Sequence, residues 1–596
     1  MRSPVRLRAS PSRLSHLSTR PERQSPELVL AALVACCLAS LIAYNQPPSA
    51  TLFNQVAALL TWGGFSIVLL LGQPALRVEV KPALPALAAL MLLLLAACAS
   101  MLWSGLPPSL ALHAVALLLA ATVMLLVGRA MHQAGQVQAV LTLLCLGWVL
   151  AGLLCAAVGG VQVFAPQWAD GDWIARSTVI GRAVSNMRQP NHLASLLMWS
   201  CVAVIWLGES RRLRREAVWA LLGLFVFTVV LSASRTGMVG VGILALWGVL
   251  DRKLNRTSRL ALLCTPLMLG LSWWLLGLWA DNSGHAFGAA TRLSAEGAGS
   301  PSRLAILANA WELVKQNPLT GVGWGEFNLA WTMTPFPARP VAFFDHTHNL
   351  PMQLMVELGL PLALLVLGLL GWALYRAFVA GLVAQGSEAV ALRCAFLMVL
   401  MIGLHSLLEY PLWYAYFLLP AALFLGLCLG DAGDAANRSS RWTLPAGALT
   451  MGGGLMVVCS LLTLVDYRSA VVIYAPPAGA ASLETRIHRG QQSPLFATQA
   501  DYAAATTLSP GPEALAAARR TAHNLIDVRL MMAWAQSLHA TGDDERARYV
   551  VERLREFRSP QGDEWLAVCG EARPEGEPRP FQCEPVTRVF EFREMR

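Results

Sequence analysis

The sequence predicts an all-α, polytopic membrane protein with a small helical domain after its last span, and three observations support this fold class. Of the 596 residues, 56% are hydrophobic and only 14% are charged, whereas soluble proteins carry roughly 25% charged residues. About thirteen apolar stretches precede residue 465, and a helix of about 20 apolar residues crosses a bilayer. Lysine and arginine gather in alternate connections between these stretches, as in other membrane proteins.

The predicted spans follow one another with mostly short connections, and the eighth is short. They run approximately over residues 28–46, 50–72, 83–103, 109–128, 139–164, 191–208, 216–232, 237–250, 260–280, 351–375, 389–408, 411–430 and 443–464.

The basic residues indicate the orientation, because short cytoplasmic loops are enriched in Lys and Arg. Residues 1–27 carry six arginines, and the loops 209–216 and 251–259 are also basic. The connections 46–49 and 104–108 contain neither Lys nor Arg. We therefore expect a cytoplasmic N-terminal tail and, after an odd number of spans, a periplasmic C-terminal domain. The net charge of +9 then reflects the basic loops that orient the protein in the lipid bilayer, and it indicates no nucleic-acid partner.

The chain divides into a membrane domain at 28–464 and a soluble domain at 465–596. The soluble part is rich in Ala, Leu, Arg and Glu and predicts helical hairpins similar to a tetratricopeptide-like unit. Ten of the twelve cysteines lie in predicted spans, whereas Cys569 and Cys583 lie in this domain. An oxidising compartment would let these two form a disulfide. Two unrelated thiols are the alternative.

Two longer loops are expected on the outer side, at 165–190 and 281–350. Within the second, residues 302–315 predict an amphipathic helix that should lie on the bilayer surface. The glycine-rich run 321–325 follows as a flexible turn.

Three polar motifs are placed at the same boundary of the membrane by this topology. They are Gln-Pro-Asn-His at 189–192, Ser-Arg-Thr-Gly at 234–237 and Asp-His-Thr-His-Asn at 345–349. Polar residues gathered at one lipid boundary indicate an active site.

The order of these motifs resembles that of the O-antigen ligase superfamily. Arg303 precedes Gly-Val-Gly-Trp-Gly, and His-Thr-His-Asn-Leu-Pro comes later. The stretch 405–414 is similar to a late motif of the bacterial protein O-oligosaccharyltransferases, which glycosylate pilins. The resemblance covers about residues 180–430. It implies a GT-C-like fold and transfer of a glycan from undecaprenyl pyrophosphate to a hydroxyl acceptor on the periplasmic face, without nucleotide sugar, cofactor or metal.

Arginines are the expected ligands of the donor pyrophosphate, because a guanidinium is a planar fork of donors that stays charged. Arg235 lies at an outward-facing span boundary, and Arg303 matches a second arginine of the family. Arg182 and Arg188 lie near the Gln-Pro-Asn motif and are weaker candidates. The alternatives are a snorkelling interfacial arginine for Arg235 and a solvated helix charge for Arg303.

His348 is the expected general base, because histidine can hold a proton near neutral pH. Asn349 and Pro351 after it suit the start of the tenth span. His346 is the alternative base or a substrate ligand. A metal site at Asp345, His346 and His348 is less favoured, because no further cluster of ligands supports it.

Neutral and acidic residues are candidate substrate ligands. Gln189 and Asn191 offer amides to sugar or phosphate, with helix capping as the alternative. Glu409 and Tyr410 lie between two spans on the outer side. Glu357, two turns inside the tenth span, needs a buried partner, for which an arginine of the site is one candidate.

The sequence therefore predicts an O-linked oligosaccharyltransferase of a Gram-negative inner membrane, acting on Ser or Thr of an exported protein such as pilin. An O-antigen ligase acting on lipid A-core and a Wzy-type polymerase are alternatives within the same chemistry. A transporter is the alternative from another class, although no paired halves are apparent in the sequence.

Overall fold

Each of the thirteen predicted spans coincides with helix in the computed structural model, which describes residues 25–596 except 180, 291–300, 338, 431–441 and 572–577. The all-α fold class is confirmed. The helices are α1 (Pro26–Leu41), α2 (Leu52–Leu71), α3 (Leu84–Trp103), α4 (Pro108–Gln133), α5 (Val137–Phe164), α6 (Pro190–Glu209), α7 (Arg215–Ser232), α8 (Arg235–Leu250), α9 (Arg256–Leu263), α10 (Thr265–Ser283), α14 (Leu350–Val383), α15 (Gly386–Ser406), α16 (Ala415–Cys428) and α17 (Ala446–Tyr474).

The helices make this chain a multi-pass membrane protein. Among the described residues, nine helices are long and apolar enough to cross a bilayer, and α9 and α10, bent by 42° at the break between them, meet the same criterion as a pair. Three shorter apolar helices, α1, α8 and α16, occupy the remaining predicted spans. The count of thirteen crossings stays a prediction.

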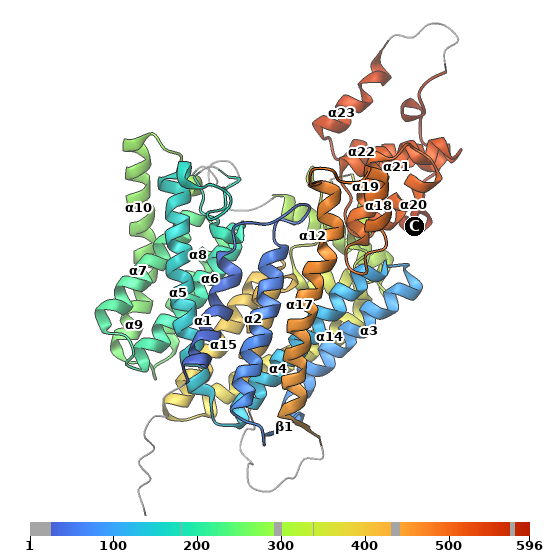
Figure 1. Ribbon diagram of the computed structural model, residues 1–596. Coiled ribbons are helices and arrows are strands. Elements are labelled where there is room, and N and C mark those ends of the chain that lie inside the picture. The colour runs from blue at the N-terminus through green and yellow to red at the C-terminus, as the bar shows by residue number, and fades with distance from the viewer. Residues whose placement is uncertain (1–24, 180, 291–300, 338, 431–441, 572–577) are drawn as a thin grey trace, which may run out of the picture.

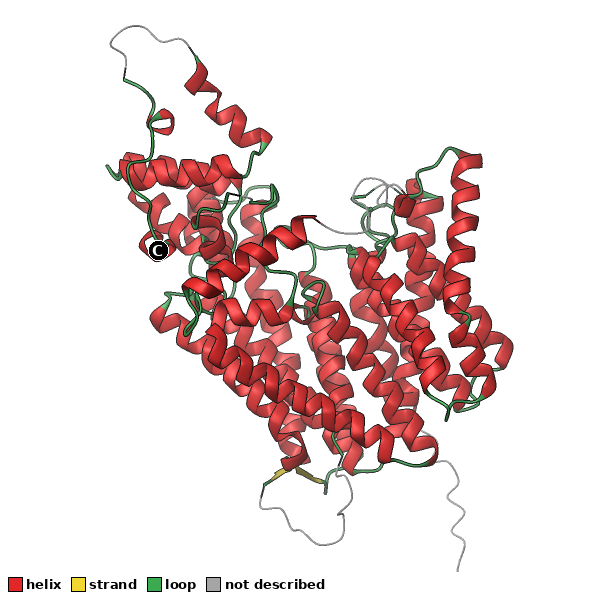
Figure 2. Ribbon diagram, turned by 180° about the vertical axis from the view of Figure 1, so that it is seen from behind, coloured by secondary structure: helices red, strands yellow, loops and turns green. Residues whose placement is uncertain are grey.

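The basic loops lie at the end of the bundle opposite the C-terminal helices (Figures 1 and 2). The short antiparallel pair β1 (Arg77–Glu79) and β2 (Thr443–Pro445) also lies at that end. This arrangement agrees with the asymmetry of Lys and Arg in the sequence. The assignment of the two ends to cytoplasm and periplasm stays a prediction.

Helix α14 is broken at Gly359, where φ is 75° and the chain turns away from the helical path. The glycine-rich segment after α12 (Pro301–Gln316) packs on this break. Leu360 N donates to the Pro318 carbonyl at 2.8 Å, and Val322 N donates to the Val356 carbonyl at 2.9 Å. A Cβ on Gly359 would lie 2.4 Å from the Leu319 carbonyl oxygen. Glycine is required because the backbones approach closely at a positive φ.

The outer loop and the C-terminal helices share one hydrophobic core. It joins α12 and α13 (Phe327–Met333) to the helices of the tail, which include buried Trp534 and Tyr549. The tail helices are α18 (Leu483–Gly490), α19 (Ala497–Thr507), α20 (Pro512–Thr521), α21 (Val528–Ala540), α22 (Asp544–Glu556) and α23 (Pro560–Leu566).

The shared core bears on two expectations. Helix α12 buries Ile306 and Leu313 inside the protein while Leu304 and Trp311 stay exposed, so part of its apolar surface packs on protein and its contact with a bilayer stays a prediction. Helix α17 also continues past residue 464 to Tyr474. Its extension is held by Asp466, whose Oδ2 accepts from Ser493 Oγ at 2.8 Å and from Leu495 N at 3.0 Å.

Polar contacts fasten the tail to the outer loop. The buried Arg339 donates through Nε to Glu556 Oε2 at 2.8 Å, and Tyr549 Oη donates to the Met333 carbonyl at 2.6 Å. His523 Nδ1 lies 2.7 Å from Glu326 Oε1. The outer loop and the tail therefore act as one packed unit on the membrane bundle.

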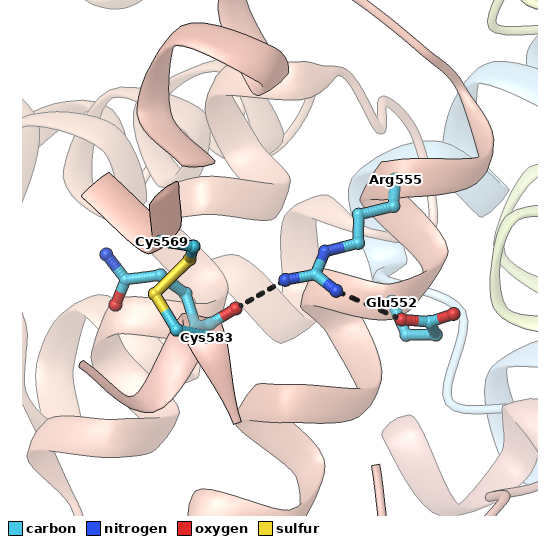
Figure 3. Close-up of a disulfide and its surroundings, with 5 residues drawn as sticks. Glu552, Arg555, Cys569 and Cys583 are labelled. Carbon is cyan, nitrogen blue, oxygen red and sulfur yellow. Dashed lines mark hydrogen bonds and ion pairs between the residues drawn. A yellow bond between two sulfur atoms is a disulfide. The ribbon is translucent and has the colours of Figure 1, made fainter. Parts of the chain in front are cut away.

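Cys569 and Cys583 form a disulfide in the last part of the tail (Figure 3). Arg555 of α22 donates to the Gln582 carbonyl at 2.8 Å, beside the bridge. The disulfide and this hydrogen bond both join the segment that follows the tail helices to the helices themselves.

Candidate active site

Glu409 lies at the centre of the candidate active site, between α15 and α16. Its Oε2 lies 2.5 Å from His348 Nδ1, and its Oε1 accepts from Asn191 Nδ2 at 3.0 Å. Arg303 Nη2 forms an ion pair with the same Oε1. Only 8% of the Glu409 side chain is exposed. One buried carboxylate thus joins residues from four separate segments of the chain.

The start of α6 meets the start of α8 at this carboxylate. Ser234 Oγ donates to Asn191 Oδ1 at 2.6 Å and accepts from Gly237 N at 3.1 Å as the N-cap of α8. Arg235, the first residue of α8, is therefore the next residue in the chain after Ser234, a member of this hydrogen-bond network. The Gln-Pro-Asn and Ser-Arg-Thr-Gly motifs are brought together as the sequence predicts.

The turn before α14 fixes the backbone of His348. His348 has φ 56°, a left-handed conformation that is uncommon outside glycine. Asn349 Oδ1 accepts from Met352 N at 3.0 Å and caps α14, while Asn349 Nδ2 donates to the Leu407 carbonyl at 3.0 Å. The turn is thereby tied both to α14 and to the end of α15.

The charges around Glu409 keep it ionised. Burial by itself would raise the pKa of this carboxyl, but the hydrogen bond from His348 and the positive charge of Arg303 outweigh burial, so the pKa is lowered from its ordinary value of 4.5. The carboxylate is therefore a fixed anion next to the histidine.

Aromatic rings form a second wall beside His348. The His346 ring stacks on Tyr410 with centroids 4.3 Å apart, and Trp413 lies 4.9 Å from His346. One tightly packed pocket is lined by these rings, His348 and Gln353. His346 is thus placed on the pocket wall and pairs with Asp345, at 3.1 Å, while His348 contacts Glu409.

Glu357 differs from its predicted environment. Its side-chain partner is Gln353, whose Nε2 donates to Glu357 Oε1 at 2.9 Å, and this amide takes the place of the arginine that was one candidate. Gln353 Oε1 accepts from Thr347 N at 2.8 Å. Glu357 therefore supports the histidine turn from behind through Gln353.

Three other candidate residues form hydrogen bonds with the protein's own backbone. Gln189 Oε1 accepts from His192 N at 2.9 Å, so this side chain caps α6, which was the alternative to a substrate role. Arg188 Nη2 donates to the Ala43 carbonyl, and Arg182 Nε donates to the Ser232 carbonyl at 3.2 Å. The substrate roles predicted for these three residues stay predictions.

Two residues near the site belong to motifs of the sequence but were given no role of their own there. Ser234 holds Asn191, and its position before Arg235 as an N-cap was the available signal. His405, one helical turn before Glu409, lies 2.8 Å through Nδ1 from Ser195 Oγ. The spacing of four residues between His405 and Glu409 places both on one side of the chain.

The part of the chain that the structure describes contains no group of three or more His, Cys, Asp or Glu side chains arranged to hold a metal. Asp345 is directed to His346, and His348 is directed to Glu409. The less favoured metal-site alternative gains no support from this geometry.

Two family models match the chain. The model described as O-Antigen ligase matches residues 194–367, and the one described as Virulence factor membrane-bound polymerase, C-terminal, matches residues 394–564. The first includes Arg235, Arg303 and His348, and the second includes Glu409. The chain is thus a polytopic membrane protein that is similar to O-antigen ligases over the matched residues, and the resemblance seen in the motifs is confirmed.

Two curated proteins of Acinetobacter baylyi are similar to the chain. A general O-oligosaccharyltransferase is 28% identical over 270 residues, which are 43% of this chain and 45% of the relative. A ComP-specific O-oligosaccharyltransferase is 25% identical over 313 residues, 50% of this chain and 54% of the relative. The chain spans about half the length of the curated relatives it matches.

Proposed function

We propose that this chain is a metal-independent glycosyltransferase that moves an oligosaccharide from undecaprenyl pyrophosphate to Ser or Thr hydroxyls of an exported protein such as pilin. The reaction takes place at the periplasmic face of a Gram-negative inner membrane. The observation that carries the proposal is the convergence of His348, Arg303 and Asn191 on Glu409. The names of the two curated relatives support a protein acceptor.

The donor pyrophosphate is bound by arginines in this proposal. Arg235 begins α8 beside the network, and Arg303 is the cation nearest to Glu409. Arg303 exchanges its carboxylate partner for a phosphate oxygen when the donor binds, because a guanidinium accommodates either oxyanion in the same geometry. The positive charge stabilises the pyrophosphate as it leaves.

His348 acts as the general base. It accepts the proton of the acceptor hydroxyl while the hydroxyl oxygen attacks the anomeric carbon. The bond between that carbon and the phosphate oxygen breaks, and its electron pair leaves with the pyrophosphate. A single displacement of this kind inverts the anomeric configuration.

Co-expression in a bacterium without its own ligase tests the function. The cell supplies a lipid-linked glycan together with either a pilin or a complete lipopolysaccharide core, and His348→Ala serves as the inactive control. A glycan mass shift on pilin, absent from the core and from the control, is the expected result. Modification of the core alone would assign the chain to O-antigen ligation, which the match to the O-antigen ligase model favours as the second candidate.

A further inference from the structure

We propose that Glu409 is the positioning residue of His348: it fixes the imidazole in one tautomer and stabilises the imidazolium that forms during transfer. This inference rests on the proposed function and deepens it. It replaces the direct substrate contact that the sequence suggested for Glu409.

The contact between the two side chains selects the tautomer. An ionised carboxylate has no proton to donate, so the proton between Glu409 Oε2 and His348 Nδ1 belongs to the histidine. The lone pair of the neutral ring then lies on Nε2, which is left to accept the proton of a hydroxyl. The Phe344 ring, with its centroid 5.3 Å from that of His348 and perpendicular to it, packs against the imidazole.

The other oxygen of Glu409 holds the carboxylate in place. Oε1 accepts from Asn191 Nδ2 and pairs with Arg303, while Asn191 itself is held by Ser234. When the donor takes over Arg303, Asn191 stays on Oε1 and His348 stays on Oε2, so a sugar hydroxyl would have to displace one of these two residues to reach the carboxylate. Its occupied oxygens and its burial therefore favour a positioning role over glycan binding.

The proton balance follows from this geometry. The acceptor O–H gives its proton to His348 Nε2, while the proton on Nδ1 stays hydrogen-bonded to Glu409. The ring becomes an imidazolium next to a carboxylate, which stabilises the added charge. After the pyrophosphate leaves, the imidazolium releases its new proton to solvent and the neutral tautomer returns.

A pH–rate profile tests the role, using the full-length protein in lipid nanodiscs with an undecaprenyl pyrophosphate trisaccharide and a purified type IV pilin. Glu409→Gln removes the charge with little change in shape. Glu409→Asp keeps the charge and shortens the side chain. Glu326→Gln is the matched control, because Glu326 is also a buried carboxylate that pairs with a histidine, His523 of the tail.

The other titratable or charged groups around the pair are Arg303 on α12, His405 on α15, Asp345 and His346 in the turn, and Tyr410 and Tyr414 after α15. None of these is altered by the variants. A shift of the profile can therefore be assigned to the loss of the Glu409 charge.

The transfer rate of Glu409→Gln should fall about 100-fold or more, and the acid limb of its profile should move to lower pH, because the imidazolium loses its anion. Donor affinity should not weaken, since Arg303 is released from its carboxylate partner. Glu409→Asp should be slower but keep its acid limb near the parental pH, which preserves the test if the glutamine variant does not fold. Glu326→Gln should keep the parental profile.

A parental profile for Glu409→Gln, or a loss of rate matched by an equal loss of donor binding, would overturn the positioning role. If the unaltered protein modifies lipid A-core and not pilin, the protein acceptor is wrong and the same profile is measured on the core. Absence of transfer to both acceptors overturns the proposed function together with this inference.

Discussion

Arg339 provides the sharpest test of how the outer loop and the tail hold each other. Arg339 is only 2% exposed, and its guanidinium donates to Glu556 and to the Trp331 carbonyl, each at 2.8 Å. It also lies over the Phe557 ring, 4.8 Å from its centroid. Replacing it by methionine keeps much of the volume and removes every one of these polar contacts.

The expected magnitude follows from the partners left behind. Removing one member of a buried ion pair costs about 3 to 5 kcal/mol. We expect the low end, about 3 kcal/mol, because Arg553 Nη1 lies 2.6 Å from Glu556 Oε1 and continues to neutralise it. A loss of this size increases the local opening equilibrium by about 100-fold.

Hydrogen–deuterium exchange of the full chain in nanodiscs measures this local opening. In Arg339→Met, backbone amides of α13 and α22 should exchange about 100-fold faster, while those of α5 and α6 should not change. Arg588→Met is the control, because this arginine is about half exposed, with 54% of its side chain accessible, and surface pairs contribute little. Exchange in Arg339→Met that matches the control would refute the view that this pair secures the shared core.

The remaining predictions concern the site, the orientation and the disulfide. His348→Ala should lower the transfer rate by about 100- to 10,000-fold with the donor still bound. Arg303→Ala should weaken donor binding by about tenfold, because a charge-assisted bond worth about 1.5 to 3 kcal/mol is lost together with the pair between Arg303 and the carboxylate. Single-turnover and binding assays separate the two effects, and parental transfer rates in both variants would contradict the mechanism. A periplasm-active reporter fused after residue 470 should be active and one fused after residue 212 silent, and the reverse pattern would invert the topology. The two tail cysteines of the full chain should resist alkylation until reduced, so labelling of both without reductant would contradict the disulfide.

The sequence by itself determined the helical fold, because the signal for each span is local. An apolar stretch of sufficient length forms a helix in lipid whatever surrounds it, since its backbone polar groups must pair within the segment. The starts of α8 and α14 were equally local, because Ser234 and Asn349 cap the residues that directly follow them. For the same reason the polar motifs could be assigned to one boundary of the membrane.

The tertiary structure alone decided which polar residues meet. Asn191, Arg303 and His348 are separated from Glu409 by 218, 106 and 61 positions. No periodicity relates such distant residues, and their meeting depends on how α6, α12, α14 and α15 pack. The sequence therefore supplied Glu409 as a candidate but could not reveal that its two oxygens are shared by a base, an arginine and an amide.

The same reason applies to the outer region. An amphipathic helix has one apolar face, and the sequence of α12 cannot tell whether lipid or protein covers that face. In the structure Ile306 and Leu313 are buried against α13 and the tail, whereas Leu304 and Trp311 stay exposed. No sequence pattern pointed to Arg339 either, because a buried arginine is recognisable only from the carboxylate and carbonyl groups that the fold brings around it.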